Sequence, residues 1–251
     1  MRRLLLIGIG TGNPEHVTLQ AVRALNAAEV IFLIDKGEAK AELVRVRREI
    51  CERYIEGTQP RFVEAADPER DRSPADYGVA VEDWHAARAE LYESLIAENL
   101  GADGTGAFLV WGDPSLYDST IRIVDRIRAR GRLVLDVAVV PGITSVQALA
   151  AGHRIALNGI GEPVTITTGR RLADDLSADG ATVVMLDGKV DFAGLDPDLT
   201  IHWGAYLGTA DELLVSGRLG DVAELIRDTR RAARARHGWI MDIYRLSRPA
   251  T

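Results

Sequence analysis

Apolar runs and amphipathic stretches alternate along the first part of the chain. Leu4–Ile9 and Val30–Ile34 are short aliphatic runs, which are typical of strands buried on both faces of a parallel sheet. A helix is predicted between them, because the Asn13 side chain can accept hydrogen bonds from free N–H groups and Pro14 suits a first helical position. This order of elements predicts an α/β domain with a parallel sheet.

The alternation continues with one interruption, at residues 57–80. Three prolines (Pro60, Pro68 and Pro74) and a charge cluster in that interval predict a long loop or an insertion. The other elements predicted in this part are helices over Ala41–Tyr54, Trp84–Leu100, Ser119–Arg130 and Ser145–Ala151, and strands over Ala107–Trp111 and Leu133–Val140.

After His153 the strand candidates are shorter and closer together, which predicts a mixed or antiparallel second sheet. We therefore expect two domains, an N-terminal one over residues 1–156 and a C-terminal one over residues 157–251. The elements expected in the second are strands over Val164–Thr168, Ala181–Leu186, Thr200–Tyr206, Glu212–Leu219 and Trp239–Arg245, and an arginine-rich helix over Asp221–His237.

Glycine marks three of the predicted strand ends. Ligands of open parallel sheets bind at the carboxyl ends of strands, and glycine lets a ligand approach the main chain there. Asp113, Thr144 and Ser145 are able either to cap the segments that follow or to hydrogen-bond a ligand. The three loops are Gly8-Ile9-Gly10-Thr11-Gly12, Gly112-Asp113-Pro114 and Pro141-Gly142-Ile143-Thr144-Ser145.

Composition limits the kinds of ligand and partner. The net charge of -7 argues against broad phosphate neutralisation, so we expect no nucleic-acid partner. Only three of the 30 Lys and Arg residues are lysines, so an anionic ligand would meet the forked guanidinium groups of arginine. The single cysteine, Cys51, excludes an intramolecular disulfide, and no HxxxH or HExxH pair occurs, so we expect no metal.

The absence of a long apolar segment bears on location. No run approaches the roughly 18 consecutive apolar residues of a membrane-spanning helix. The N-terminus passes from Arg2 and Arg3 directly into a strand, unlike a signal peptide. We therefore expect a cytoplasmic protein with no membrane partner.

The first glycine loop allows a second interpretation. Gly8, Gly10 and Gly12 partly match a dinucleotide fingerprint, and Asp35 ends the second strand, where a ribose-binding acid would stand. The fingerprint is GxGxxG, however, and here the third glycine comes too early. An NAD(P)-dependent oxidoreductase is therefore an alternative, and a tight turn that simply needs glycine is another.

Taken together, the three loops resemble the tetrapyrrole methyltransferases of cobalamin biosynthesis. That family carries an N-terminal G-x-G-x-G-[DN]-P loop, a central G-D-P loop and a P-G-[IV]-[ST]-[SA] loop, and all three occur here in that order. The resemblance covers essentially the whole chain. Four further segments are most similar to the branch that methylates precorrin-5 at C-1 and releases acetate: Ile34–Lys40, Trp111–Ser119, Gly204–Gly208 and His237–Asp242.

The resemblance implies a two-domain α/β fold with a parallel N-terminal sheet, a mixed C-terminal sheet and S-adenosyl-L-methionine in the cleft between the domains. It also implies a homodimer that acts on a small tetrapyrrole and yields S-adenosyl-L-homocysteine. The residues that would contact the cofactor are Trp111, Gly112, Asp113, Leu116, Thr144, Ser145, Leu186, Asp187, Ala205 and Gly208. Those that would contact the tetrapyrrole are Gly10, Thr11, Gly12 and Glu38.

Release of acetate requires a group that activates water or stabilises an oxyanion. Our candidates for this catalytic role are Asp35, Lys36 and Tyr117. Alternatives within the same fold are a methyltransferase acting on another tetrapyrrole, on diphthine or on ribosomal RNA, and a relative that binds the cofactor without catalysis. The arginines that we expect to pair with substrate carboxylates are Arg2, Arg45, Arg48 and Arg154.

Overall fold

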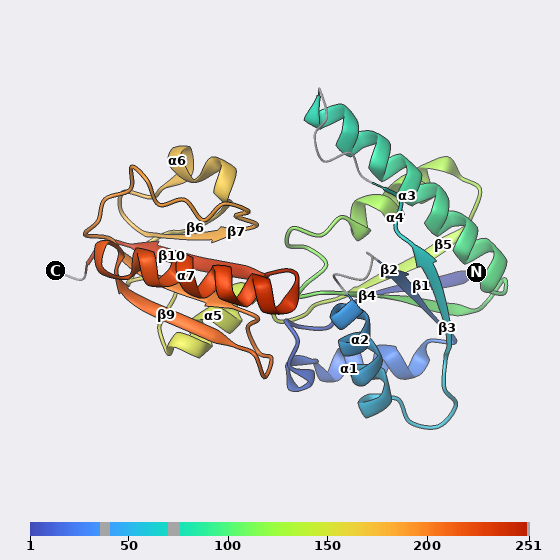
Figure 1. The fold of residues 1–251 in the computed structure, drawn as a ribbon. Helices are drawn as coiled ribbons and strands as arrows, with labels where there is room; N and C mark the ends of the chain where they lie inside the picture. Colours follow the sequence, from blue (N-terminus) through green and yellow to red (C-terminus); the bar gives the residue numbers. More distant parts are fainter. Residues whose placement is uncertain (36–40, 70–75, 250–251) are drawn as a thin grey trace. The chain divides into compact units, whose positions relative to one another are not determined.

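Ten strands build two five-stranded sheets within the described residues, which are 1–35, 41–69 and 76–249 of the computed structural model. Packing divides the chain into two units, Met1–Ile143 and Thr144–Thr251, and each unit contains one of the sheets (Figure 1). The sheet of the first unit is parallel and that of the second is mixed, so the predicted fold class is confirmed.

The first sheet is formed by β1 (Arg2–Gly8), β2 (Val30–Asp35), β3 (Arg61–Ala66), β4 (Thr105–Val110) and β5 (Leu135–Val140). Their spatial order is β3-β2-β4-β1-β5, and every neighbouring pair is parallel. Leu6 of β1 pairs with Phe108 of β4 on one side and Val139 of β5 on the other. The carboxyl ends of β1, β4 and β5 are consequently neighbours, at the edge where sheets of this type bind ligands.

Two helices cover each face of this sheet: α1 (Leu19–Ala27) and α2 (Ala41–Tyr54) on one, α3 (Tyr77–Asn99) and α4 (Thr120–Arg130) on the other (Figure 1). Successive strand residues point to opposite faces. Leu5 and Ile7 accordingly pack with α1 and α2, whereas Leu4 and Leu6 pack with α3 and α4. Both faces of β1 are buried, which explains its uninterrupted aliphatic sequence.

The second sheet is formed by β6 (Val164–Thr168), β7 (Ala181–Met185), β8 (Thr200–Ala205), β9 (Leu213–Arg218) and β10 (Asp242–Ser247), in the order β6-β7-β10-β8-β9. Only β6 and β7 pair in parallel, and the other pairs are antiparallel. Since β10 runs against both β7 and β8, the carboxyl ends of β7 and β8 lie at the same sheet edge as the amino end of β10.

Two helices, α5 (Ser145–His153) and α7 (Leu219–His237), pack on the second sheet. Ile226 of α7 shares a buried cluster with Trp203, whereas Leu149 of α5 lies beside Gly204, the next residue of β8. Because neighbouring strand residues face opposite ways, α5 and α7 cover opposite faces. Between β6 and β7 the chain forms a 3₁₀ turn (Gly169–Arg171) and the short helix α6 (Leu172–Asp175).

The boundary between the units falls between Ile143 and Thr144, earlier than the expected boundary at residue 156. The physical reason is that α5 packs on the second sheet. The His153 ring nitrogen Nε2 lies 2.9 Å from the Trp203 carbonyl oxygen, and Gly152 faces Leu214 of β9. This helix therefore belongs to the second unit, although the sequence placed it in the first.

The interval predicted as a loop or an insertion contains regular structure. Within residues 57–80 lie strand β3 and the first turn of α3, which Asp76 caps by accepting the N–H groups of Gly78 and Val79. The prediction of an irregular segment is therefore wrong for these parts. β3 is an edge strand whose positions are all half-buried or exposed, so it lacks the apolar run that revealed β1 and β2.

The helix predicted to begin at Asn13 is also different in the structure. The Asn13 side chain accepts the Glu15 N–H, but it caps only a 3₁₀ turn over Pro14–His16. The α-helix proper, α1, begins at Leu19, and its cap is Thr18, whose hydroxyl accepts the Ala21 N–H over 3.1 Å. The α-helix therefore begins after the second capping residue, Thr18, and not after Asn13.

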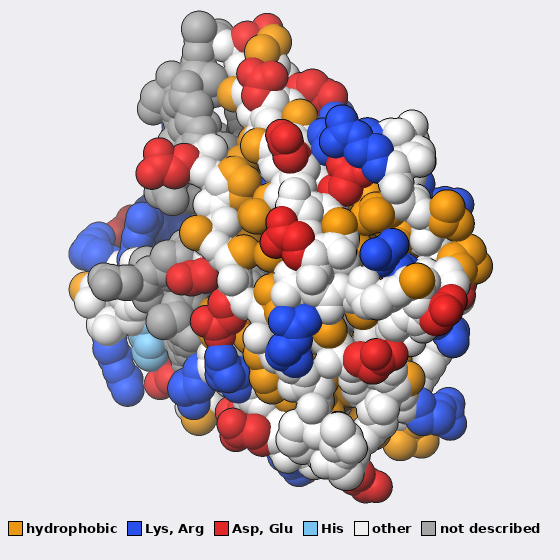
Figure 2. Space-filling view, turned by 90° about the vertical axis from the view of Figure 1, so that its right-hand side faces the viewer, with side chains coloured by type: hydrophobic (Ala, Val, Ile, Leu, Met, Phe, Trp, Pro, Cys, Tyr) orange, Lys and Arg blue, Asp and Glu red, His pale blue; other side chains and the backbone are white. Residues whose placement is uncertain are grey.

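Charges of both signs share the surface. Figure 2 shows one face of the molecule, on which Lys and Arg side chains are interspersed with Asp and Glu side chains. Within residues 1–35, 41–69 and 76–249, no helix has the length and apolar character that crossing a membrane requires.

Candidate active site

The three glycine loops meet in the first unit, where they touch through the main chain. The Gly112 N–H donates to the Gly10 carbonyl over 2.8 Å, and the Gly10 N–H donates to the Gly112 carbonyl over 3.3 Å. A Cβ atom on Gly8 would lie 2.6 Å from the Gly142 nitrogen and 2.8 Å from the Gly112 oxygen. The loops therefore pack backbone against backbone, and no side chain fits where they meet.

Backbone conformation adds a second requirement for glycine. The φ angle is +79° at Gly10, +126° at Gly12 and +68° at Gly112, a region that residues with a side chain rarely adopt. The sequence analysis explained these glycines by a ligand that approaches the main chain. At Gly8 and Gly142, however, the neighbouring loop itself occupies the space that a side chain would need.

Asp113 joins the central loop to the Pro-Gly loop. Its Oδ2 accepts the Gly142 N–H over 2.8 Å, and its Oδ1 accepts the Ser115 N–H over 2.7 Å. Burial is the largest single influence and opposes the charge, but the hydrogen bonds from Ser115 and Gly142 together lower the pKa of Asp113 below its ordinary value. The carboxylate is thus engaged by donors of its own unit.

Thr144 and Ser145 open the second unit at the start of α5. The Thr144 hydroxyl accepts the Val146 N–H over 3.2 Å, and the Gln147 side chain accepts the Thr144 N–H over 2.9 Å. These two bonds form a capping box. The sequence left two roles open for Thr144, capping or ligand binding, and the structure contains the capping role. Ser145 is the half-buried first residue of the helix.

Two predicted cofactor segments of the second unit, at Leu186 and at Tyr206, directly follow β7 and β8 and flank the amino end of β10. Both residues have left-handed backbone, with φ of +54° and +50°. This conformation costs a residue with a side chain about 1–2 kcal/mol, and such strain collects at functional sites. The Leu186 side chain is also 65% exposed, which is unusual for a large apolar group.

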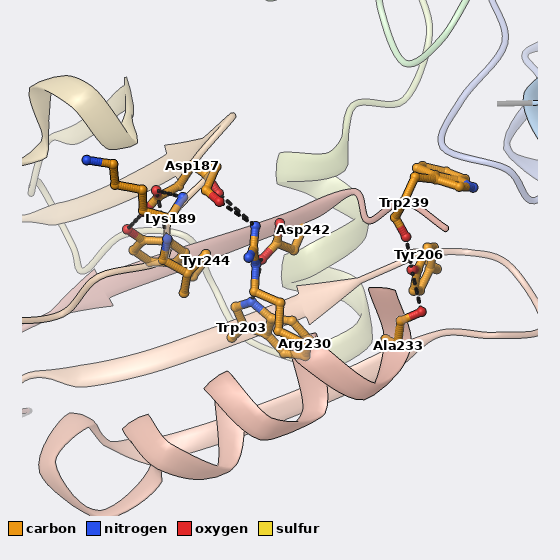
Figure 3. A network of polar contacts seen from close by, with 11 residues as sticks. Asp187, Lys189, Trp203, Tyr206, Arg230, Ala233, Trp239, Asp242 and Tyr244 are labelled. Carbon is orange, nitrogen blue, oxygen red and sulfur yellow. Dashed lines mark hydrogen bonds and ion pairs between the residues drawn. The ribbon is translucent and has the colours of Figure 1, made fainter. Parts of the chain in front are cut away.

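Figure 3 shows the polar network that holds the loop after β7. The Asp187 carboxylate accepts the Tyr244 hydroxyl over 2.7 Å and the Val190 N–H over 2.9 Å. Arg230 of α7 donates to the carbonyls of Asp187 and Gly188 over 3.1 and 3.2 Å. These contacts fix the loop. The sequence analysis placed Asp187 near the cofactor, but its carboxylate is hydrogen-bonded to groups of the second unit.

Asp242 in turn fixes Arg230. Its Oδ2 accepts Arg230 Nε over 2.9 Å and the indole N–H of Trp203 over 3.1 Å. The two charged side chains are 6% and 13% exposed. Burial raises the pKa of Asp242 above its ordinary value, although the Arg230 charge acts in the opposite direction. The segment ending in Asp242 therefore helps to hold the loop after β7.

The segment after β8 is held by further contacts. The Ala205 side chain is fully buried in the core of the second unit. The Tyr206 hydroxyl donates to the Trp239 carbonyl over 2.6 Å, and the Gly208 N–H donates to Glu212 Oε2 over 2.7 Å (Figure 3 shows Tyr206 and Trp239). A ligand at Ala205 would therefore meet the main chain rather than the side chain.

The candidate catalytic residues lie at two strand ends of the first unit. Asp35 is the exposed last residue of β2, beside a pocket of about 170 Å³ that Leu33 and Glu64 also line. Tyr117 lies in the loop after β4, is 43% exposed and has left-handed backbone, with φ of +50°. Lys36 and Glu38 lie outside the described residues.

The residues predicted to contact a tetrapyrrole in the first loop are buried. Gly10 and Gly12 are buried, and Thr11 is only 3% exposed, with its hydroxyl 3.4 Å from His16 Nδ1. In the central loop, Trp111 is half-buried and packs on the core beneath α1 and α2. Leu116 of that loop is also half-buried.

Three of the four arginines proposed as carboxylate partners have side-chain contacts within the described residues. Arg2 donates to the Leu100 carbonyl over 3.0 Å, and Arg48 pairs with Glu64. Arg45 lies 4.0 Å from Glu49 one helical turn away, and Arg154 ends α5 in left-handed conformation. In the described part of the chain, no group of three or more His, Cys, Asp or Glu side chains is arranged to hold a metal ion.

One buried arginine was missed by the sequence interpretation. Arg88 of α3 is 4% exposed and lies 2.8 Å from Asp67, just beyond β3. It also donates to the Ser119 hydroxyl over 2.8 Å and to the Tyr92 hydroxyl over 2.7 Å. It therefore links the chain after β3 to the end of the central loop. The sequence did contain a sign that Arg88 is buried, because it lies next to Ala89 and one turn before Tyr92, both on the apolar side of the helix.

Three comparisons place the chain among known proteins. The sequence profile of the family described as Tetrapyrrole (Corrin/Porphyrin) Methylases matches residues 3–223. A protein of Sinorhizobium sp. named Precorrin-6A synthase (deacetylating) is 56% identical over 252 residues, which cover 100% of this chain and 97% of that protein.

Solved structures agree with this match. The crystal structure of a putative cobalamin synthesis related protein (CobF) from Corynebacterium diphtheriae is 41% identical, covers 98% of both chains and superposes with a TM-score of 0.82. Uroporphyrin-III C-methyl transferase from Thermus thermophilus, complexed with S-adenyl homocysteine, is 20% identical and covers 98% of this chain and 97% of that one, with a TM-score of 0.62. The second likeness shows the fold alone.

Proposed function

The chain belongs to the tetrapyrrole (corrin/porphyrin) methylase family, and from that premise we propose that it methylates precorrin-5 at C-1. S-adenosyl-L-methionine is the methyl donor, and the extruded acetyl group leaves as acetate to give precorrin-6A in cobalamin biosynthesis. One observation carries the proposal. Identity of 56% runs through the whole chain to a relative named for this deacetylating synthesis, with no part of the chain left unmatched.

Members of this family use S-adenosyl-L-methionine, and one solved relative is complexed with S-adenyl homocysteine. The residues present fit a ligand of this kind. The Gly142 main chain stays half-buried after β5, and Leu186 offers an exposed apolar side chain on strained backbone. An adenosyl group requires apolar contact together with main-chain donors and acceptors.

We assign the cofactor contacts to four short segments. In the first unit these are Trp111–Asp113 and Leu116 of the central loop. In the second they are Thr144 and Ser145, Leu186 and Asp187, and Ala205 with Gly208. The carboxylate of Asp113 and the side chain of Ala205 are engaged within the protein, so these residues contribute main-chain groups. No metal takes part in this proposal.

The bound cofactor supplies an electrophilic methyl group on a sulfonium. When the cofactor is bound, that methyl would be open to in-line displacement by carbon C-1 of the macrocycle, with the electron pair of the carbon–sulfur bond left on sulfur. The protein contributes position, because holding reacting atoms about 3–3.5 Å apart in an aligned geometry can remove roughly 7–11 kcal/mol of the barrier. Rigid loops serve this role: Arg88 fixes the end of the central loop, and Arg230 fixes the loop after β7.

Acetate release needs a second chemical step. Water adds to the acetyl carbonyl and gives its proton to a base. The carbon–carbon bond to the macrocycle then breaks, its electron pair is taken up by the conjugated macrocycle, and the acetyl carbon leaves as acetate. We propose Asp35 as that base, with Lys36 and Tyr117 stabilising the developing oxyanion. In this proposal the tetrapyrrole is contacted by main-chain groups of Gly10, Thr11 and Gly12 and by Glu38. We also propose that the enzyme is a cytoplasmic homodimer.

Mass spectrometry tests the activity directly. The enzyme is incubated with precorrin-5 and methyl-labelled donor, and both the macrocycle and free acetate are measured. The proposal expects one added labelled methyl and one acetate per turnover. A labelled product without acetate, or methylation of a different tetrapyrrole in preference to precorrin-5, overturns the assignment to this reaction.

A further inference from the structure

The buried guanidinium of Arg88 contacts two segments of the first unit, the chain after β3 and the loop after β4. On one side its Nε lies 2.8 Å from the carboxylate of Asp67, whose backbone N–H donates to the carbonyl of Asp35 over 2.8 Å. On the other side Arg88 donates to the Ser119 hydroxyl over 2.8 Å, two residues after Tyr117. Short series of contacts therefore link Arg88 to two candidate catalytic residues.

The chain after β3 is held in place by α3. The Trp84 indole N–H donates to the Pro68 carbonyl over 3.0 Å, directly after Asp67. The Arg88 guanidinium lies over the Trp84 ring, 4.5 Å from its centre, in a cation–π contact. The Asp67 side chain is only 12% exposed, so its carboxylate has little freedom to leave Arg88. The carbonyl of Asp35 is consequently bound to a fixed donor.

The Ser119 hydroxyl serves this link and not the helix that it precedes. A serine just before a helix ordinarily accepts an N–H of the first turn. Ser119 makes no such side-chain bond to α4, and Asp118 accepts the Thr120 N–H instead. Tyr117, with φ of +50°, needs a fixed neighbour of this kind, because strained backbone persists only where its surroundings hold it.

The partners of Arg88 engage all three nitrogens of its guanidinium. Nε faces Asp67, and the two terminal nitrogens donate to Ser119 and Tyr92. The group is planar and its donors form a rigid fork, so none of these contacts can shift alone. A buried ion pair adds little net stability compared with apolar packing, because desolvation offsets the attraction. The arrangement therefore acts mainly on geometry.

We propose that Arg88 is a positioning residue that holds Asp35 and Tyr117 at a fixed separation for the release of acetate. Because Arg88 is 4% exposed, it acts through Asp67 and Ser119 and not by contact with the substrate. The inference rests on the proposed function, since that function gives Asp35 and Tyr117 their catalytic roles.

Methyl transfer should depend on Arg88 less than acetate release does. The cofactor part of the central loop is held separately, because Asp113 accepts the Gly142 N–H. Loosening Ser119 leaves that bond in place. A loss of positioning should therefore appear as slow acetate release with methyl transfer largely retained.

Single-turnover assays on the full chain test the proposal. Precorrin-5 and methyl-labelled donor are supplied, and labelled macrocycle and free acetate are followed in the same samples. Arg88→Lys keeps a charge beside Asp67 but loses the fork, and Ser119→Ala cuts only the link to the central loop. Both variants should release acetate about tenfold more slowly or worse, with methyl transfer within about threefold of the unchanged protein, because small misplacements of reacting groups are costly.

Tyr92→Phe is the matched control. It removes one acceptor of the same guanidinium without touching the chain after β3 or the central loop. Acetate release should stay within about twofold of the unchanged protein, because the contacts with Asp67 and Ser119 persist. Ser119→Thr retains the hydroxyl and should restore release. A purely structural Arg88 would instead make the Tyr92 and Ser119 variants lose both products to the same extent.

Amide hydrogen exchange gives a readout that does not depend on activity. In Ser119→Ala, exchange of the Asp67 N–H, which donates to Asp35, should accelerate about tenfold, because the far end of the link is loosened. In Tyr92→Phe it should stay unchanged.

Three results would overturn the inference: normal acetate release by both Arg88→Lys and Ser119→Ala, an equal defect in Tyr92→Phe, or exchange at Asp67 that does not respond to Ser119→Ala. If the unchanged protein and the variants all complete both steps at normal rates, only this inference fails. If the unchanged protein transfers no methyl or frees no acetate, the proposed function fails, and the exchange experiment then decides whether Arg88 couples the two segments.

Discussion

The carboxylate of Asp113 accepts the backbone N–H of Gly142 over 2.8 Å, and this bond joins the loops that follow β4 and β5. A hydrogen bond to an ionised acceptor is among the stronger kinds in proteins. It also explains how two loops far apart in the sequence keep one arrangement while their glycines pack without side chains between them.

Replacing Asp113 by Asn should destabilise the first unit in a pH-dependent way. The amide leaves one N–H partner without an acceptor, which costs about 1–3 kcal/mol. Because the folded-state pKa of Asp113 is lowered, its contribution is present above the ordinary aspartate pKa of about 4 and disappears as pH falls through the lowered value. Urea unfolding across this range should therefore show the two proteins converging in acid.

The control for Asp113 is Asp125→Asn. Asp125 is an exposed residue of α4 whose ion-pair partner Arg128 is 3.7 Å away, so its loss should change stability by less than about 1 kcal/mol. An Asp113 difference that persists unchanged in acid would contradict the role given to the carboxylate.

Gly112→Ala should weaken cofactor binding by more than its effect on folding explains. Gly131 is a matched control, because it has the same φ of +68° and ends α4 with no atom within 4 Å of the position that a Cβ would take. Both variants should lose about 1–2 kcal/mol of stability from the left-handed backbone. Only Gly112→Ala should lose affinity for S-adenosylhomocysteine by calorimetry, and equal affinities in the two variants would remove Gly112 from the site.

Arg230→Gln and Asp242→Asn should each destabilise the second unit strongly. Removing one partner of a buried ion pair typically costs about 3–5 kcal/mol, because the other charge stays buried. The neighbouring pair Arg231–Asp228 provides the comparison, since its side chains are 74% and 64% exposed and the pair is worth about 1 kcal/mol or less. Chemical unfolding of the single and double variants measures both couplings, and similar values for the two pairs would refute the argument.

Asp35→Asn and Lys36→Ala should separate the two halves of the proposed reaction. Methyl transfer depends on positioning and should persist, whereas acetate release should fall by about a hundredfold or more if a general base or an oxyanion partner is lost. Labelled methyl in the macrocycle and free acetate are quantified in the same reaction. Normal acetate release by both variants would show that hydrolysis takes place elsewhere.

His202 should make the second unit sensitive to mild acid. Burial, followed by the nearby His153 and Arg245 charges, lowers the pKa of His202 from 6.5 to about 4. The unfolded chain then binds a proton that the folded chain does not, so stability falls as pH drops from about 6.5 towards 4. His202→Gln should flatten this part of a urea-midpoint profile, and an unchanged slope would exclude His202 as its source.

The sequence predicted those parts of the structure that depend on local pattern. The aliphatic run at Leu4–Ile9 located β1, and the three glycine motifs located strand ends that do meet in the first unit. The family resemblance is confirmed by a match over residues 3–223. These features could be recognised because burial on both faces and left-handed turns restrict which residues are tolerated.

Features that depend on partners distant in the sequence could not be predicted. β3 was missed because an edge strand has no continuous apolar run, and α5 was placed in the wrong unit because only packing shows which sheet it covers. Arg88 looked like any other arginine of a helix until Asp67 and Ser119 were found beside it. That the Asp113 and Asp187 carboxylates are engaged within their own units was likewise visible only in three dimensions.

The position of β10 has a consequence for biosynthesis. This strand lies between β7 and β8, although all of its partners precede it in the chain. The first unit can fold while translation proceeds at about 5–20 residues per second, but the second sheet stays open until residues 242–247 have emerged. A premature stop shortly before Asp242 would therefore remove the centre of that sheet rather than a dispensable tail, and would leave two unpaired strand edges prone to aggregation.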